Sequence, residues 1–255
     1  SGEGSDELLG GYVGYRFDAQ PKLPRGAKDV HELLEEEMNR KLWGAPDFFY
    51  EKNYHDFRDT TRALYSEAVN GAYESFDCLP RLGIDAGKLA ALDPFHKRSY
   101  LDLKLRLSDH LVADHGDRTL YANSVEGRYP FLDVNLVECV KKIPPGVKLK
   151  GLVEKYILKK VAEKYLPAEV VYRQKFGFIA PGSPQLLRTH SEWINDLLSY
   201  ERVRKQGYFN PATVERLKKA YGKEGFELNL PFENDLLISI LTFNIFLDVF
   251  NMPGL

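Results

Sequence analysis

Apolar residues recur at helical spacing along most of this chain of 255 residues, and segments that alternate between apolar and polar residues are nearly absent. Over 31–43 and 150–165 the apolar side chains fall on one stripe, which is typical of a helix that packs on one face. Only the short run from Val170 to Tyr172 has the composition of a β-strand. The sequence therefore predicts a mostly α-helical fold.

Glycine, proline and polar residues divide the rest of the chain into segments. Further helices are expected after Ser5 and over 56–73, 94–105, 108–122, 134–142, 190–200, 211–221 and 231–251. Loops are expected over 17–29 and 173–184, where prolines and glycines interrupt the pattern. Because the chain shows no internal repeat and is short enough for one core, we expect a single domain over 1–255.

The charge balance argues against a large polyanionic partner. The chain carries 35 lysines and arginines and 37 acidic residues, a formal net charge of −2, so no overall field attracts nucleic acid or an anionic membrane. The most apolar stretch, 236–250, is interrupted by polar residues and is shorter than the roughly 20 residues of a bilayer span. We therefore expect a small-molecule substrate, with no nucleic acid and no membrane.

The two cysteines, Cys78 and Cys139, provide neither a disulfide framework nor a paired metal-ligand spacing. Reduced, buried thiols in a cytoplasmic protein are the expectation. The acidic, glycine-rich opening is unlike the basic and then apolar pattern of a signal peptide, so secretion is not indicated.

The opening residues, SGEGSDE, combine flexible glycine backbone with the carboxylates of Glu3, Asp6 and Glu7, ahead of a predicted helix. Such backbone can approach a ligand closely, and Mg²⁺ commonly takes one or two carboxylates together with substrate phosphates. The alternative interpretation is an acidic helix cap, with Ser5 as the capping residue, which requires no ligand.

Two later segments also concentrate charge. After Tyr172, the cations Arg173 and Lys175 lie among aromatic residues, where they would either neutralise phosphate charge in an adenylyl transfer or be solvated surface cations. Within 117–133, charged residues alternate with apolar ones. A partly buried ion-pair network that fixes a loop is expected there, formed by Glu126, Arg128 and Asp133.

Three segments, in this order and at this separation, resemble the synthetase domain of the class B, glutamine-dependent asparagine synthetase family. They are SGEGSDELLGGY at the start, ANSVEGRYPFLD over 122–133 and EKYILKKVAEKYLPAEVVYRQKFGF over 154–178. The resemblance covers residues 1–180. It implies the C-terminal helical portion of an α/β synthetase domain of the adenine-nucleotide α-hydrolase-like type (PP-loop ATP pyrophosphatase), whose parallel sheet lies largely outside this chain.

The resemblance implies an ATP-dependent ligase that adenylates a carboxylate, aspartate in the first instance, and transfers ammonia or an amine to it. By match to the family's positions, Ser1 and Gly2 would contact the adenylate, and Glu3 would act in forming or aminolysing the intermediate. Asp6 would bind Mg²⁺, and Lys175 would stabilise charge as pyrophosphate departs. A supporting role is implied for four further residues, Asp117, Arg118, Glu126 and Arg128.

Two features of the family, the SGG-x-DS phosphate loop and the glutaminase domain with its terminal cysteine, are absent from this sequence. We therefore expect an N-terminal half in the same precursor or a companion chain, no activity from this chain alone, and an apolar surface that favours self-association. Gly127, Tyr129 and His115–Gly116 also differ from residues common in asparagine synthetases. They leave open a related ligase that makes β-lactams, cyclic peptides or amidated natural products, and a non-catalytic helical partner subunit is a further alternative.

Overall fold

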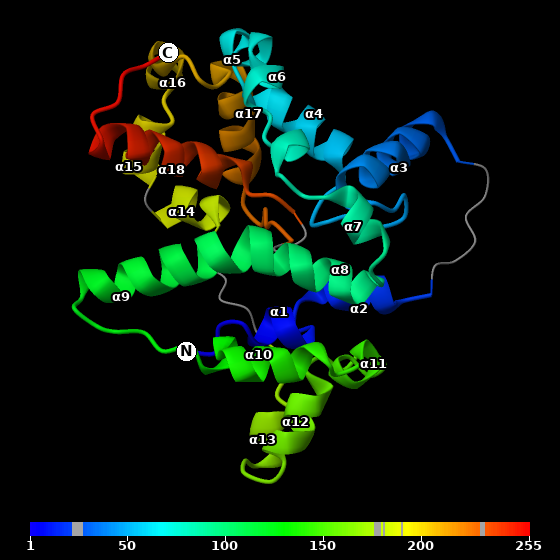
Figure 1. The fold of residues 1–255 in the computed structure, drawn as a ribbon. Coiled ribbons are helices and arrows are strands. Elements are labelled where there is room, and N and C mark those ends of the chain that lie inside the picture. The colour runs from blue at the N-terminus through cyan, green and yellow to red at the C-terminus, as the bar shows by residue number, and fades with distance from the viewer. Residues whose placement is uncertain (22–27, 176–179, 181, 190, 230–232) are drawn as a thin grey trace. The chain divides into compact units, whose positions relative to one another are not determined.

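The computed structural model describes residues 1–21, 28–175, 180, 182–189, 191–229 and 233–255. Within these residues the chain is helical and contains no β-strand (Figure 1); the bridges found there are two isolated ones, between Tyr65 and Phe209 and between Lys150 and Val153. The prediction of a mostly α fold is therefore confirmed. The strand-like run at Val170 belongs to a short helix, α13 (Ala168–Val171).

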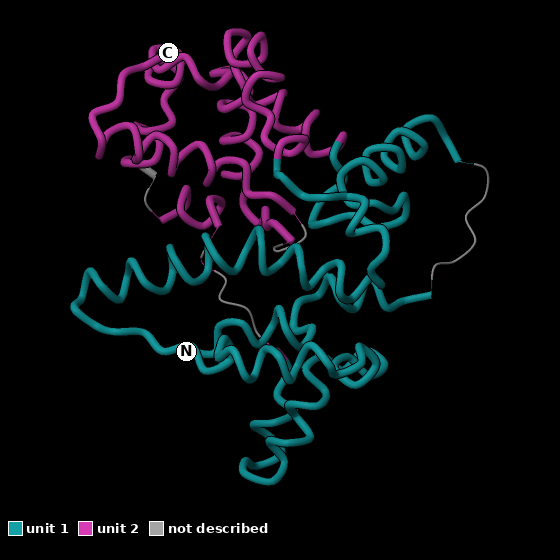
Figure 2. The backbone as a smooth tube through the Cα atoms, viewed as in Figure 1, with its two compact units in different colours: residues 1–54, 82–174 teal, residues 55–81, 175–255 magenta. Residues whose placement is uncertain are grey.

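The chain divides into two compact units, shown in different colours in Figure 2. Unit 1 consists of residues 1–54 and 82–174, and unit 2 consists of residues 55–81 and 175–255. Each unit is thus built from two stretches of sequence. The expectation of one synthetase-type domain over 1–255 stays a prediction.

Unit 1 contains the opening loop and twelve helical elements. They are α1 (Ser5–Leu9), α2 (Val13–Ala19), α3 (Val30–Trp43), α7 (Ala86–Ala90), α8 (Pro94–Leu101), η2 (Asp102–Arg118), α9 (Thr119–Ala122), η3 (Pro130–Leu132), α10 (Val134–Lys141), α11 (Pro145–Lys148), α12 (Tyr156–Ala162) and α13.

A continuous helical rod formed by α8, η2 and α9 is the longest feature of unit 1 (Figure 1). Asp93 caps its start by accepting a hydrogen bond from the His96 N–H at 3.1 Å, and Pro94 occupies the first turn. The expected break between 94–105 and 108–122 does not occur, because the backbone stays right-handed helical at both junctions. The middle of the rod, η2, is wound as a π-helix, a form that is rare and often found near functional sites.

Small hydrophobic clusters hold the opening helix in place. Leu8 and Leu9 of α1 are buried with Val140 of α10, which lies beside α1 in Figure 1. Tyr15 of α2 packs against Phe95 of α8, with ring centroids 4.9 Å apart. Full burial of one large apolar side chain stabilises the fold by about 1.5 to 3 kcal/mol relative to leaving that side chain exposed. The start of the chain is therefore anchored to both α10 and the rod.

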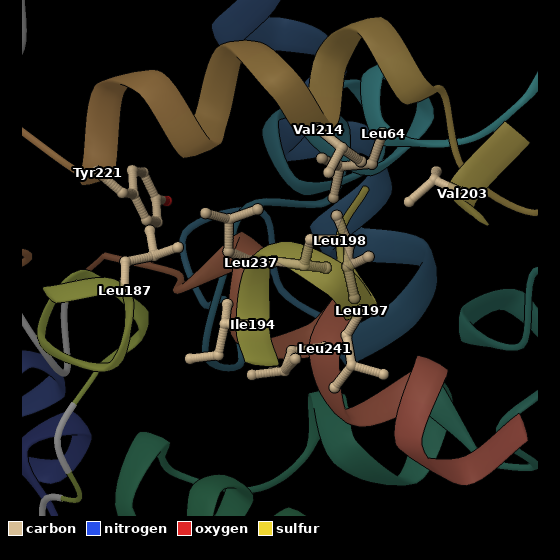
Figure 3. Packing of buried hydrophobic residues seen from close by; sticks show 11 residues of the cluster. Leu64, Leu187, Ile194, Leu197, Leu198, Val203, Val214, Tyr221, Leu237 and Leu241 are labelled. Carbon is tan, nitrogen blue, oxygen red and sulfur yellow. The ribbon is translucent and has the colours of Figure 1, made fainter. Parts of the chain in front are cut away.

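Unit 2 has one larger core, shown in Figure 3. Its helices are α4 (Tyr54–Leu64, all but the first residue), α5 (Glu67–Gly71), α6 (Tyr73–Phe76), η1 (Leu79–Arg81), α14 (Ser183–Thr189), α15 (Ser191–Leu197), α16 (Tyr200–Gln206), α17 (Pro211–Tyr221) and α18 (Leu236–Val249). Leu198, Val214 and Leu237 are fully buried at the centre of this core. The apolar stretch at 236–250 is helical as expected, and α18 buries one face, with Leu237, Ile240 and Leu241 in the core and Val249 exposed.

The helix expected over 56–73 is three helices, α4, α5 and α6. It ends at Leu64 because Tyr65 forms its bridge with Phe209, and the Ser66 N–H donates to the Tyr208 carbonyl oxygen at 3.0 Å. Ser66 then caps α5 by accepting a hydrogen bond from the Val69 N–H at 3.2 Å. A tertiary contact thus overrides a continuous helical pattern.

Two further expectations about helix boundaries are wrong. The helix expected over 150–165 is confined to α12, because Lys155 adopts a left-handed conformation with φ 50° and blocks any earlier start. The loop expected over 173–184 ends at Ser183, where α14 begins. Residues 176–179 and 181 of that predicted loop lie outside the described residues.

The expected burial of the two cysteines is also wrong, because both free thiols are exposed. Cys139 precedes the buried Val140 on α10, and neighbouring positions of a helix point in different directions. Among the described helices, none is both long enough and apolar enough to cross a membrane.

Candidate functional site

A glycine fixes the geometry of the opening loop. Gly4 occupies the N-cap position of α1 with φ 90°, a left-handed conformation that favours glycine. A Cβ atom at Gly4 would lie 2.3 Å from Leu132 Cδ2, so the loop can lie against η3 only without a side chain there. The expectation that Ser5 caps this helix is wrong, because Ser5 lies inside the first turn and its hydroxyl binds elsewhere.

The buried hydroxyl of Ser5 contacts Lys155, which precedes α12. The Lys155 ammonium donates to Ser5 Oγ at 2.8 Å and lies 3.0 Å from Asp6 Oδ1. The side chain of Lys155 is 20% exposed and that of Asp6 is 24% exposed. Because partial burial reduces screening by water, this ion pair is stronger than a typical surface pair.

The backbone brings these side chains together. The Lys155 N–H donates to the Leu9 carbonyl oxygen at 3.2 Å, which joins the start of α12 to the end of α1. A Cβ atom at Gly11 would lie 1.9 Å from Asp6 Oδ1 and 2.4 Å from Lys155 Cε, so this glycine is required for the close approach. Sequence reasoning missed Lys155, although it lies within the third family-like segment, because its partners are in the first.

Ser1, Gly2 and Glu3 form the exposed edge of the same site. The Ser1 nitrogen donates to the Arg128 carbonyl oxygen at 2.8 Å, and the Glu3 N–H donates to Ser1 Oγ at 3.2 Å. Ser1 and Gly2 are exposed, and Glu3 is half-buried. The structure therefore brings together four of the predicted residues, including Asp6, and adds the cation of Lys155. A cation beside accessible backbone can bind and neutralise a phosphate that gains charge, and the carboxylates could act on a phosphate only by holding a metal ion.

The carboxyl of Glu7 lies beneath this loop and is fully buried. Tyr12 donates its phenolic proton to Glu7 Oε1 at 2.5 Å, and the hydroxyls of Tyr15 and Ser99 donate to the Glu7 carbonyl oxygen. Burial raises the pKa of the Glu7 carboxyl, against the opposing effect of the Tyr12 hydrogen bond. Glu7 therefore joins α1 to α2 and to the rod, and has a structural role that the sequence did not reveal.

A second buried carboxyl, Asp102, supports the rod at the junction of α8 and η2. Asp102 Oδ1 accepts a hydrogen bond from the Tyr50 hydroxyl at 2.8 Å and lies 3.8 Å from Arg106 Nη1. Burial raises the pKa of Asp102 despite these partners. Arg106 also binds Glu51 at 2.6 Å and lies 4.5 Å above the ring of Tyr12. This network connects the rod to the residues around α1.

The expected ion-pair network within 117–133 is only partly present. Arg128 and Glu126 pair at 3.0 Å, but their side chains are 79% and 67% exposed, so the pair contributes little. Asp133 takes no part in it and instead caps α10, because its carboxylate accepts from two backbone N–H groups. The prediction of a partly buried network is therefore wrong.

The two charged residues at the end of η2 have separate partners. Asp117 accepts a hydrogen bond from the Tyr129 hydroxyl at 2.8 Å. Arg118 pairs with Asp114 one turn earlier on the exposed side of the rod. Asp117 is thus the member of the predicted supporting set that connects two distant segments.

The predicted catalytic cation Lys175 is exposed and belongs to unit 2, whereas the opening loop belongs to unit 1. Arg173, from the same predicted segment, is also exposed. The role of Lys175 stays a prediction. Lys155 is a cation that lies beside Asp6.

The donor set around Asp6 is too small for a metal site made of protein groups alone. Across the described parts of the chain, no cluster of three or more His, Cys, Asp or Glu side chains could hold a metal ion. Mg²⁺ commonly binds through one or two carboxylates and substrate phosphates, and retains waters. Asp6 fits that mode of binding, with Glu3 as a second carboxylate in the same loop.

Residues 1–246 match the protein family described as asparagine synthase, and this chain therefore belongs to the asparagine synthase family. A relative from Mycobacterium tuberculosis is 32% identical over 191 residues, which cover 71% of this chain and 29% of the relative. "Asparagine synthetase [glutamine-hydrolyzing] 1" of Bacillus subtilis is 28% identical, over 78% of this chain and 33% of that protein. "Amidase chyE" of Penicillium rubens is 27% identical, over 88% of this chain and 38% of that protein.

This chain thus spans about a third of the length of the curated relatives that it matches. No solved structure matches it. The helical structure is consistent with a helical portion of the family's synthetase domain.

Proposed function

We propose that this chain forms part of an ATP-dependent ligase that makes an amide from a carboxylate. A carboxylate oxygen of the substrate attacks the α-phosphorus of ATP, and the bond from that phosphorus to the bridging oxygen breaks, which yields an acyl-adenylate and pyrophosphate. Ammonia or an amine then attacks the acyl carbon, loses a proton and displaces AMP. Membership of the asparagine synthase family supports this type of reaction.

The observation that carries the proposal is the Lys155 ammonium held beside Ser5 and Asp6 at the opening loop. Adenylation concentrates negative charge on the α-phosphate and on the departing pyrophosphate, and a cation placed in advance stabilises that charge. We assign this role to Lys155, with Lys175 as a second cation. Asp6 would hold Mg²⁺, which when bound neutralises phosphate oxygens.

The exposed edge of the loop would bind the other reactants. Ser1 and Gly2 offer accessible backbone to the adenylate, and the bond from the Ser1 nitrogen to Arg128 holds that backbone in place. The Glu3 carboxylate would orient the amine or accept the proton that it loses, since a carboxylate within hydrogen-bond reach can serve as a general base.

Aspartate and ammonia are the substrates that we propose first, because the relatives from Mycobacterium tuberculosis and Bacillus subtilis are both named as asparagine synthetases. The SGG-x-DS loop and the glutaminase would come from another part of the same polypeptide or from a companion chain in the cytoplasm. The resemblance to "Amidase chyE" supports a second candidate, a ligase that acts on another carboxylate or amine. Asparagine formed at an ordinary rate from aspartate, glutamine and ATP by the full-length protein would remove this second candidate.

The test of the proposal is Lys155→Met in the full-length protein, assayed by aspartate-dependent exchange of pyrophosphate into ATP. We expect kcat to fall by about 10²–10³-fold, the usual cost of removing a group that stabilises transition-state charge. Lys160→Met is the matched control, because Lys160 lies on α12, is 42% exposed and contacts Glu163 and the Tyr172 hydroxyl at the surface. Its kcat should stay within about twofold of wild type.

Equal losses in the two variants, or full exchange in Lys155→Met, would contradict the assignment of Lys155. A non-catalytic partner subunit makes the opposite prediction, since Glu3→Gln, Asp6→Asn and Lys175→Met would then leave the activity of the assembly unchanged. The chain of residues 1–255 alone should give no exchange, because it lacks the phosphate loop that positions ATP.

A further inference from the structure

The hydroxyl of Tyr129 connects the end of the rod to the segment beside the opening loop. It donates to Asp117 Oδ1 at 2.8 Å, between residues twelve positions apart in the sequence. Asp117 lies in the last turn of η2, and Tyr129 directly precedes η3. The Asp117 carboxylate raises the pKa of the Tyr129 phenol to about 12, so the phenol remains a hydrogen-bond donor at neutral pH.

Two glycines make room for this hydroxyl. A Cβ atom at Gly116 would lie 2.4 Å from the Tyr129 hydroxyl oxygen, and one at Gly127 would lie 3.0 Å from it. Carbon and oxygen atoms that are not bonded cannot approach as closely as 2.4 Å without displacement of one of them. The Tyr129 hydroxyl therefore depends on Gly116 and, more weakly, on Gly127, where a Cβ atom would first meet Leu120 Cδ1 at 2.5 Å.

The segment that follows Tyr129 supports the opening loop. Leu132, three residues after Tyr129, lies over Gly4, and the Leu132 N–H donates to the Tyr129 carbonyl oxygen at 2.9 Å. The charge of Glu3 is also among those that act on the Tyr129 phenol. A displacement of Tyr129 would therefore move the support of the loop that carries Glu3.

We propose that Tyr129, anchored by Asp117 in the space left by Gly116 and Gly127, is a positioning residue that holds the opening loop and Glu3 for the acyl-transfer steps. This inference rests on the proposed function. These residues would act on the reaction indirectly, because they support the loop and do not touch the reacting atoms.

The experiment compares Tyr129→Phe, Gly116→Ala and the double variant in the full-length protein. Tyr129→Phe keeps the ring and removes only the hydrogen bond, so we expect kcat for aspartate-dependent exchange to fall about tenfold, with KM for ATP within about twofold of wild type. The kcat of Gly116→Ala should fall at least as much, although alanine has a higher helix propensity than glycine. In the double variant the hydroxyl is gone, so kcat should return to the level of Tyr129→Phe.

Hydrogen exchange of the opening loop gives a readout that does not depend on the reaction. Tyr129→Phe should speed the exchange of amides in a peptide that covers residues 1–9 by about tenfold, because the loop would open more often. Tyr165→Phe is the control. Tyr165 follows α12 in the sequence, is 77% exposed and lies outside the site. Asp117→Asn keeps a hydrogen-bond acceptor, so it should speed this amide exchange less than Asp117→Ala does.

The proposal is overturned if the amides of residues 1–9 exchange hydrogen as fast in wild type as in Tyr129→Phe. It is also overturned if the effects of Gly116→Ala and Tyr129→Phe on kcat simply add in the double variant. The amide exchange over residues 1–9 can be read even if the full-length protein proves to have no pyrophosphate-exchange activity with aspartate. In that case the proposed reaction fails, and loop protection alone decides whether Tyr129 positions the loop. Circular dichroism shows whether a variant has failed to fold. If Tyr129→Phe or Gly116→Ala does not fold, Asp117→Asn is compared with wild type in its place.

Discussion

At the scale of single residues, the buried carboxyl of Glu7 makes the stability of unit 1 depend on pH. Burial raises its pKa above the ordinary value of 4.5, and the charges of Asp6 and Asp102 act in the same direction, whereas the hydrogen bond from Tyr12 lowers it. The folded chain therefore binds this proton more tightly than the unfolded chain. The resulting stabilisation is complete below the unfolded pKa and is lost as the pH rises through the folded pKa.

Glu7→Gln removes this titration and keeps an oxygen that can accept the hydrogen bond from Tyr12. We expect the free energy of unfolding of Glu7→Gln, relative to wild type, to increase as the pH rises above the ordinary carboxyl pKa of 4.5, because only the wild type loses this proton. Urea denaturation at each pH measures this difference. Glu74→Gln is the control, since Glu74 is exposed on α6. A difference for Glu7→Gln that stays constant with pH would show that its carboxyl does not titrate in this range.

At the scale of elements, apolar periodicity predicted that the chain is helical, and local signals predicted several boundaries. Asp93 and Pro94 start the rod as expected, because a cap and a first-turn proline need only local sequence. Boundaries failed where a distant partner decides them. Tyr65 ends α4 by bridging Phe209, and Lys155 is left-handed because its N–H binds Leu9. No periodicity within a helix could show either contact.

A single carboxylate, Asp235, controls the start of two helices in unit 2. Its Oδ1 accepts from the Ile238 N–H of α18 at 3.0 Å and from the Ser183 hydroxyl at 2.5 Å, and its Oδ2 accepts from the Ser183 N–H at 2.6 Å. Asp235→Ala should therefore lower the free energy of unfolding by about 2 to 4 kcal/mol, more than one ordinary cap. Asp85→Ala is the matched control, because Asp85 caps only α7, and should cost about 1 kcal/mol. Equal costs in urea denaturation would show that the bonds to Ser183 contribute nothing.

At the scale of the whole molecule, the sequence predicted the opening loop as the site but not the full set of residues around it. The motif SGEGSDE is local, so its glycines and carboxylates could be read directly. Lys155 is 150 residues away from Ser5, and only the packing of α1 with α10 and α12 brings the two together. The same limit applies to Tyr129, whose hydroxyl depends on space left at Gly116. Contacts of this kind follow from the fold rather than from any one segment.

The separate cores make a prediction about cooperativity, because each buried cluster among the described residues lies within one unit. Leu237→Ala would remove a fully buried side chain from unit 2 at a cost of about 2 to 5 kcal/mol. We expect hydrogen exchange to accelerate in α14 to α18 and to stay unchanged in α1 and α8. Leu101→Ala, at an equally buried position of unit 1, should give the converse pattern. Uniform acceleration in both variants would show instead that the two units unfold as one, and that damage to the core of unit 2 reaches the opening loop.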